Sequence, residues 1–187
     1  MENLTLIIPA KEEADSLPTV LREIDQLKCK KIVILHISDL NTINSIKNFD
    51  CEIIYQKNHG YGDALIEGIN NVKTDYLCIF NADGSFDPKS LKEMLALCIN
   101  HDFVFTSRYI KKGSTEDDTI LTRIGNFIFS LLGKILFSLK ISDILFTYIL
   151  GKTKSFQSLK LKSLDFCLCV EIPVKAKRLN LSYLDIP

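Results

Sequence analysis

Residues 75–88 read DYLCIFNADGSFDP, and this stretch decides the fold class. Its first part, Asp75–Phe80, has the length and the apolar content of a buried strand. The chain then turns at Asn81–Gly84, and Asp87-Pro88 opens a helical pattern that continues from Leu91 to Ile99. A buried strand that leads through a polar turn into a helix is typical of a βα unit, and in sheets of such units ligands bind beyond the carboxyl ends of the strands.

The same alternation of strand and helix extends to both sides. The other expected strands are Leu4–Ile8, Ile32–Ile37, Cys51–Tyr55, Phe103–Thr106 and Leu181–Ile186. The other expected helices run from Asp15 or Ser16 to Leu27, from Gly62 to Val72, from Arg123 to Lys140 and from Asp165 to Asn180, with a polar loop at Ile110–Thr119. We therefore predict one α/β domain over residues 1–187, with a mainly parallel central sheet covered by helices on both faces.

Composition excludes several classes of protein. The 187 residues carry 23 basic and 23 acidic side chains, so the net charge is zero, which argues against a nucleic-acid-binding protein. The longest stretch without a charged residue or histidine is Ile124–Gly133, which is too short to span a bilayer, and the acidic N-terminus does not resemble a signal peptide. The six cysteines show no paired spacing, so we expect free thiols and a cytoplasmic protein.

The carboxylates that follow Phe80 have two interpretations. Asp83 at the end of a buried strand, next to a glycine that permits a tight turn, is placed to hold Mg²⁺ or Mn²⁺ against phosphate oxygens. Alternatively, Asp83 and Asp87 only cap the helix that begins near Pro88. The tetrapeptide alone does not choose between them.

Other segments in the same order as a known family favour the metal. With LTLIIPAKEE at the start, HGYGDALIEGI in the middle and FTSRY after the fifth strand, the chain resembles the family 2 glycosyltransferases, which have the GT-A fold. Its ending, FCLCVEIPVKAKRLNLSYLDIP, resembles the dolichyl-phosphate mannose synthase and polyprenyl-phosphate sugar transferase branch. The resemblance implies an inverting transfer of a sugar from a nucleotide-diphosphate sugar, in cell-envelope or glycan synthesis. It also implies a nucleotide-sugar half at about 1–109 and an acceptor half at about 110–187.

The resemblance further implies roles for individual residues. Asp83 would be the metal ligand, and the residues that bind the nucleotide-sugar would be Pro9, Ala10, Glu13, Asp39, Gly60, Gly62, Asn81 and Asp83. Ser107, Arg108 and Tyr109 match a segment whose arginine lies near a phosphate, and Asp143 and Glu171 match acidic positions on the acceptor side. Asp83, Arg108, Asp143 and Glu171 are therefore the candidate catalytic residues. On their residue types alone, Gly60 and Gly62 could form a plain turn, and Arg108 a surface ion pair.

Three departures from the family pattern leave a second function open. His36-Ile37 replace the carboxylates that usually follow the second strand, Glu12 replaces an asparagine, and Asn81 replaces the first aspartate of the DxD motif. Loss of one negative charge at Asn81 should weaken cation binding. A catalytically weakened GT-A-like subunit that binds a nucleotide-sugar or a partner is therefore the alternative. A sugar-phosphate nucleotidyltransferase is disfavoured because no Gly-rich segment follows the first strand. His36 and His59 are expected to be structural.

The acceptor is either a lipid phosphate or a glycan hydroxyl. A lipid phosphate is mostly ionised at pH 7 and needs a cationic partner such as Arg108, whereas a hydroxyl needs Asp143 or Glu171 to take its proton. The helix predicted at 123–140 is apolar over more than one face. It therefore suits either an interfacial helix, peripheral on the inner face of a membrane, or a core helix packed on the sheet.

Overall fold

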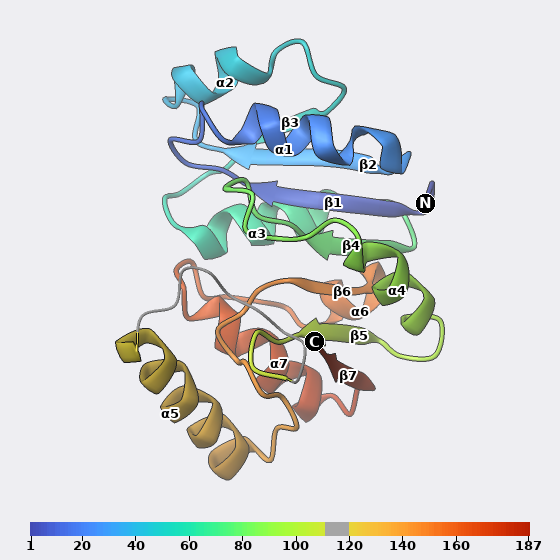
Figure 1. The fold of residues 1–187 in the computed structure, drawn as a ribbon, viewed down its shortest axis with the longest axis vertical. Helices are drawn as coiled ribbons and strands as arrows, with labels where there is room; N and C mark the ends of the chain where they lie inside the picture. The colour runs from blue at the N-terminus through green and yellow to red at the C-terminus, as the bar shows by residue number, and fades with distance from the viewer. Residues whose placement is uncertain (111–119) are drawn as a thin grey trace.

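The computed structural model describes residues 1–110 and 120–187, so most of the predicted loop at Ile110–Thr119 lies outside the described residues. A sheet of seven strands in the order β3-β2-β1-β4-β6-β5-β7 runs through the molecule (Figure 1). The strands are β1 (Leu4–Pro9), β2 (Lys30–Leu35), β3 (Glu52–Tyr55), β4 (Tyr76–Ile79), β5 (Phe103–Thr106), β6 (Ile149–Lys152) and β7 (Tyr183–Ile186). All pairings are parallel except those of β6, which is antiparallel to both β4 and β5.

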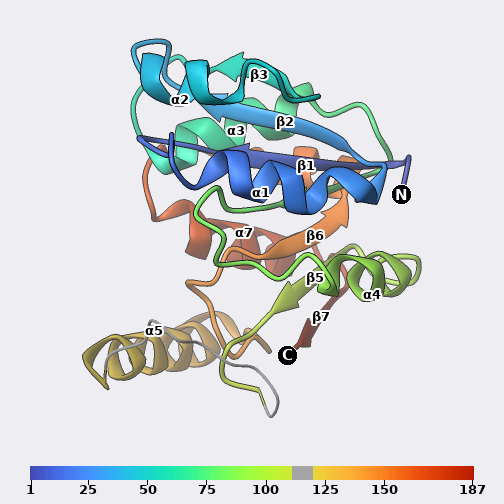
Figure 2. The same cartoon turned by 45° about the horizontal axis from the view of Figure 1, so that its top comes forward.

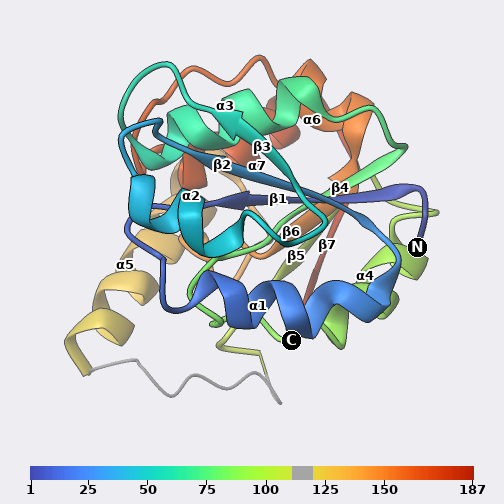
Figure 3. The same cartoon turned by 90° about the horizontal axis from the view of Figure 1, so that it is seen from above.

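Helices cover both faces of the sheet. Viewed from above, α1 and α4 lie on one side, whereas α3, α6 and α7 lie on the other (Figure 3). The helices are α1 (Leu17–Ile24, continued by the short 3₁₀ helix Asp25–Leu27), α2 (Leu40–Ile46), α3 (Tyr61–Asn71), α4 (Ser90–Leu97), α5 (Ile120–Phe137), α6 (Thr153–Ser158) and α7 (Leu168–Arg178). The predicted mainly parallel α/β sheet with helices on both faces is therefore confirmed.

The core explains why the strand predictions succeeded. Every residue of β1 is buried, and so are the last three of β4, because these strands lie inside the sheet and are covered on both faces. The core consists of one apolar cluster on each face of the sheet, and alternate residues of β1 belong to different clusters. Leu6 and Ile8 pack on the face covered by α1 and α4, whereas Ile7 packs on the face covered by α3.

The sequence interpretation missed three elements. Helix α2 has seven residues and buries only Thr42 and Ile46, so it lacks the repeated apolar spacing by which longer helices are recognised. Strand β6 and helix α6 occupy 149–158. An apolar run leads directly into β6 without a turn residue, so the sequence does not mark where this strand begins. The predicted helix from Asp165 begins later, at Leu168, and the second strand ends at Leu35 rather than at Ile37.

Helix α5 has its apolar side chains turned away from the protein. Among residues 123–137 of the helix, whose side chains the structure describes, Asn126, Ser130 and Gly133 are buried, whereas Phe127, Ile135 and Leu136 are each 66% exposed. The helix lies at one end of the molecule, apart from the sheet (Figure 2). A core helix packed on the sheet, one of the two expected alternatives, is therefore excluded. Within residues 1–110 and 120–187, no helix is both long and apolar enough to cross a bilayer.

Candidate active site

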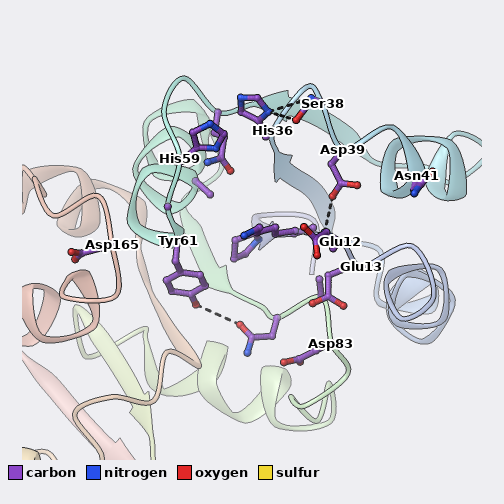
Figure 4. Close-up of a pocket in the computed structure, with 18 of the residues that line it drawn as sticks. Glu12, Glu13, His36, Ser38, Asp39, Asn41, His59, Tyr61, Asp83 and Asp165 are labelled. Carbon is purple, nitrogen blue, oxygen red and sulfur yellow. Dashed lines mark hydrogen bonds between the residues drawn. The ribbon is translucent and has the colours of Figure 1, made fainter.

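A cleft of about 1170 Å³ lies beyond the carboxyl ends of the parallel strands (Figure 4). The segments that follow β1, β2, β3 and β4 all contribute to it, as expected for parallel strands that end at one edge of a sheet. The lining residues are Pro9, Ala10, Lys11, Glu12, Glu13, His36, Ser38, Asp39, Leu40, Asn41, Gln56, His59, Gly60, Tyr61, Ala64, Asn81, Ala82, Asp83, Asp165 and Phe166.

Asp39 joins the turn after β1 to the start of α2. Its carboxylate accepts hydrogen bonds from the backbone N–H of Glu12 at 2.7 Å and from that of Thr42 at 3.2 Å. Burial alone would raise the pKa of Asp39, but these donors outweigh it and lower the pKa. Glu12 has φ of 59°, a conformation that asparagine tolerates better than glutamate, so the bond to Asp39 holds a strained turn in place. Glu13 is held beside it, because its N–H donates to Thr42 Oγ1 and its carboxylate accepts from Ser16.

Asn81 and Asp83 both line the cleft, and Asp83 lies in its lower part in Figure 4. Asp83 is exposed and accepts the backbone N–H of Ser85 at 2.9 Å, so the carboxylate also shapes the turn. Asn81 Nδ2 donates to Ser85 Oγ, and the amide oxygen of Asn81 lies 3.5 Å from the Tyr61 hydroxyl. Two oxygen-bearing side chains are thus presented where the strand β4 ends.

His36 and His59 stack in the upper part of the cleft, with ring centroids 4.4 Å apart. The Nδ1 atom of His36 accepts the backbone N–H of Ser38 at 3.2 Å and lies 2.6 Å from the Ser38 hydroxyl oxygen. We expected both histidines to be structural, but both line the cleft. The position of His36 directly after β2 was the available sequence signal.

Gly60 and Gly62 lie against the segment at 163–165. A Cβ atom at Gly60 would come within 2.2 Å of the Leu164 carbonyl oxygen, and one at Gly62 within 2.2 Å of the Ser163 carbonyl oxygen. Gly60 also has φ of +121°, which side chains other than glycine rarely adopt. These glycines therefore permit close approach of two backbones.

Glu171 on α7 holds the same segment from its other side. Its carboxylate accepts the N–H groups of Lys162 at 3.0 Å and of Ser163 at 2.8 Å, and it pairs with Lys175 at 2.7 Å. Partial burial would raise the pKa of Glu171, but Lys175 and these backbone donors outweigh it and lower the pKa to about 2. Glu171 does not line the cleft.

Arg108 and Asp143 form a buried pair away from the lining of the cleft. Arg108 Nε donates to Asp143 Oδ2 at 2.8 Å and Nη2 to Oδ1 at 3.1 Å, so both carboxylate oxygens accept from one guanidinium. The Asp143 side chain is 0% exposed and that of Arg108 is 21% exposed, with its guanidinium carbon 4.8 Å from the centre of the Phe146 ring. The sequence left a surface ion pair as the alternative for Arg108; the structure contains an ion pair, but a largely buried one.

Among the predicted nucleotide-sugar residues, only Gly62 is missing from the lining of the cleft. The candidate catalytic residues are not gathered together: Asp83 lines the cleft, whereas Arg108, Asp143 and Glu171 do not. Sequence reasoning missed Tyr61, Asp165 and Phe166. Tyr61 stands between two glycines already singled out, but nothing in the sequence indicates that residues 165 and 166 reach the same cleft.

Comparison with known proteins gives one family and one fold. The profile of Glycosyl transferase family 2 matches residues 5–160. An uncharacterised glycosyltransferase of Mycobacterium bovis is 27% identical over 93 residues, which are 50% of this chain and 42% of that protein. A protein of Mycobacterium tuberculosis matches to the same extent. The match thus spans less than half the length of these curated relatives.

Several solved structures are similar over 98% of this chain. Glucosyl-3-phosphoglycerate synthase from Mycobacterium tuberculosis, in complex with UDP, has a TM-score of 0.77 at 14% identity, with 69% of that chain covered. Mannosyl-3-phosphoglycerate synthase from Rubrobacter xylanophilus has a TM-score of 0.75 at 17% identity, with 64% covered. The Mycobacterium tuberculosis synthase has also been solved with Mn²⁺, UDP and glucosyl-3-phosphoglycerate. At these identities the likeness concerns the fold, and it confirms the expected GT-A architecture.

Proposed function

The chain belongs to the family 2 glycosyltransferases, and from that premise we propose that it transfers a sugar from a nucleotide-diphosphate sugar bound in the cleft. The observation that carries the proposal is that one large cleft at the carboxyl ends of the strands contains Asp83, Asn81, Glu13 and Asp39 together. The similar synthase from Mycobacterium tuberculosis holds UDP, which supports the same class of donor here. The turn held by Asp39 would receive the nucleoside, and the end near Asp83 its diphosphate.

A divalent cation fits the residues at Asp83. The carboxylate of Asp83 and the amide oxygen of Asn81 are ligands that Mg²⁺ or Mn²⁺ accepts. Among the described residues, no three His, Cys, Asp or Glu side chains are grouped to hold a metal ion. Asp83 and Asn81 would therefore share the ion with oxygens of the diphosphate, and the bound ion would supply positive charge that stabilises the leaving group. The protein's own contribution is the turn, fixed by the Ser85 N–H, that presents Asp83 to the cleft.

The other predicted residues suit a role beside the cleft. Asp143 fixes the direction of the Arg108 guanidinium with two hydrogen bonds, so Arg108 is a preorganised cation on the acceptor half. We retain Arg108 as the proposed contact of an acceptor phosphate, with Asp143 as the residue that positions it. This assignment favours an acceptor that is already ionised, because an Asp143 whose oxygens are both engaged is poorly placed to take a proton.

Calorimetry with UDP, GDP and their sugars, with and without Mn²⁺, tests the donor. We expect Mn²⁺ to tighten nucleotide binding, and Asp83→Ala to abolish this enhancement. Asp87→Ala is the matched control, since Asp87 is also exposed and also accepts a backbone N–H, that of Lys89 at 3.0 Å, but does not line the cleft. Absence of nucleotide binding at any Mn²⁺ concentration would refute the proposal.

The alternative is a subunit that binds a nucleotide-sugar without transferring the sugar. The observation in its favour is that Asn81 and His36 stand where the family has carboxylates. Tight, Mn²⁺-dependent donor binding in which no sugar is ever released, either to water or to any acceptor, would support this alternative. Slow release of free sugar from the donor, lost in Asp83→Ala, would favour the enzyme.

A polyprenyl-phosphate acceptor at a membrane is the finer proposal, and helix α5 supports it. Large apolar side chains face outward along its length, and its charged residues with described side chains, Arg123 and Lys134, are both basic. An exposed apolar face with a basic margin matches the surface of a membrane that contains anionic lipids. The helix would then rest on the inner face of the membrane, on the acceptor half of the molecule.

Sedimentation with liposomes tests this contact. We expect the protein to bind vesicles that contain anionic lipid, and expect Phe127→Ser with Leu136→Ser to weaken binding. Ile99→Ser is the control, because Ile99 is also 66% exposed but follows α4. Equal sedimentation of all three proteins, or none by the wild type, would contradict membrane contact through α5.

A further inference from the structure

Phe166 presents an aromatic face to the cleft. The residue is 66% exposed, yet one face of its ring is stacked on Tyr61, with centroids 4.7 Å apart and planes 13° from parallel. Both residues line the cleft. A fixed aromatic ring with one face open to the cleft is suited to pack against a flat apolar face of a ligand.

Phe166 is fixed because the segment before it is bound on two sides. On one side, Glu171 accepts the N–H groups of Lys162 and Ser163. On the other, the Leu164 carbonyl oxygen accepts the N–H of Asp63 at 3.1 Å, at the start of α3. The close approach at Gly60 and Gly62 belongs to this second contact. The acceptor half of the chain thereby completes a wall of the cleft that is otherwise built by the donor half.

The stacked pair leads directly to the candidate metal site. The Tyr61 hydroxyl contacts Thr147 Oγ1 at 2.8 Å and lies 3.5 Å from the Asn81 amide oxygen, two residues before Asp83. Figure 4 shows Tyr61 and Asp83 in the part of the cleft farthest from His36 and Ser38. In a nucleotide-sugar the sugar is attached to the diphosphate at the end opposite the nucleoside. A diphosphate at Asp83 would therefore place the sugar beside Tyr61 and Phe166.

We infer that the free face of Phe166 binds the ring of the donor sugar, and that Glu171 is a positioning residue that holds Phe166 in place. The inference rests on the proposed donor site. The C–H groups on one face of a pyranose carry partial positive charge and pack against the negative face of an aromatic ring. Glu171 is not the proton acceptor in this assignment, because its oxygens are engaged by Lys162, Ser163 and Lys175.

Calorimetry in the presence of Mn²⁺ separates the sugar from the nucleotide. The probes are UDP-glucose against UDP, and GDP-mannose against GDP. We expect Phe166→Ala to weaken binding of the sugar nucleotide that the wild type prefers by about tenfold, while binding of the free diphosphate changes less than about twofold. Phe166→Tyr keeps the ring and should retain the wild-type affinity. An equal loss for sugar nucleotide and free diphosphate would overturn the inference and indicate contact with the nucleoside, and so would no loss for either.

The role of Glu171 is tested with the same probes. We expect Glu171→Ala to weaken sugar-nucleotide binding as Phe166→Ala does, and the double variant to lose little more, because both changes remove one contact. Glu171→Gln, which retains an accepting oxygen and avoids gross disruption, should keep most of the affinity. Unchanged donor affinity in Glu171→Ala with complete loss of transfer would overturn the positioning role. If the wild type binds no nucleotide, the proposed function fails first, whereas nucleotide binding that ignores Phe166 contradicts this inference alone.

Discussion

Replacement of Gly62 by alanine is the sharpest test of how the segment at 163–165 packs against the start of α3. An ideal Cβ at Gly62 would lie 2.2 Å from the Ser163 carbonyl oxygen and 2.7 Å from that of Asp165. Real Cβ atoms essentially never come closer than 3.0 Å, so the segment must retreat by at least 0.8 Å, the difference between 3.0 Å and 2.2 Å. Both obstructing atoms belong to the backbone, so no side-chain rotation can relieve the contact.

The cost follows from what the retreat would break. The hydrogen bond from Asp63 N to Leu164 O is worth about 1 kcal/mol, and the Tyr61–Phe166 stack about another 1 kcal/mol. We therefore expect Gly62→Ala to lower the free energy of unfolding by about 2 kcal/mol. Gly125→Ala in α5 is the matched control, because its Cβ would meet no atom of the described residues within 4 Å, and it should instead add up to about 1 kcal/mol from helix propensity.

Urea denaturation followed by circular dichroism measures the difference between the two variants. The transition midpoint of Gly62→Ala should fall and that of Gly125→Ala should rise, with the dependence on urea unchanged. If Gly62→Ala is as stable as Gly125→Ala, the segment at 163–165 does not pack against α3, and Phe166 is not held in place by that contact.

Three further changes should act on stability. Arg108→Ala should cost about 3–5 kcal/mol in a denaturation experiment, because it leaves the Asp143 carboxylate buried without its cation; a smaller loss than that of Gly62→Ala would contradict the buried pair. Asp39→Ala should cost about 1 kcal/mol at pH 7 through loss of the α2 cap. Folding lowers the pKa of Asp39, so its stabilising contribution is present above the unfolded pKa of ~3.9 and is lost as the pH falls through the pKa of the folded protein. The free energies of unfolding of wild type and Asp39→Ala should therefore converge in acid. Tyr148→Phe should cost about 1 kcal/mol, since the hydroxyl donates to the Asp87 carbonyl at 2.8 Å.

The part of the site that was predictable from sequence is the part that follows strands. Asp39, Asn81 and Asp83 each come soon after a buried apolar run, and the carboxyl ends of parallel strands necessarily meet at one edge of the sheet. Phe166 offered no such signal. It reaches the cleft because the segment before it is hydrogen-bonded to Glu171 and packs against α3, and both contacts depend on the tertiary structure. The resemblance marked Glu171 as an acidic position on the acceptor side, but its partners, two backbone N–H groups and Lys175, did not follow from spacing.

Helix α5 shows a different limit of sequence patterns. Periodicity correctly predicted a helix with an apolar stripe, but it does not say which stripe faces the protein. Specific polar contacts decide: Asn126 Nδ2 donates to the Tyr109 hydroxyl at 2.7 Å, and Ser130 Oγ accepts the N–H of Ile144 at 3.1 Å. These bonds use the polar stripe to attach the helix and leave the apolar stripe outside. An outward apolar stripe leaves apolar surface in water, at a cost in free energy, and the proposed contact of α5 with a membrane would remove that cost.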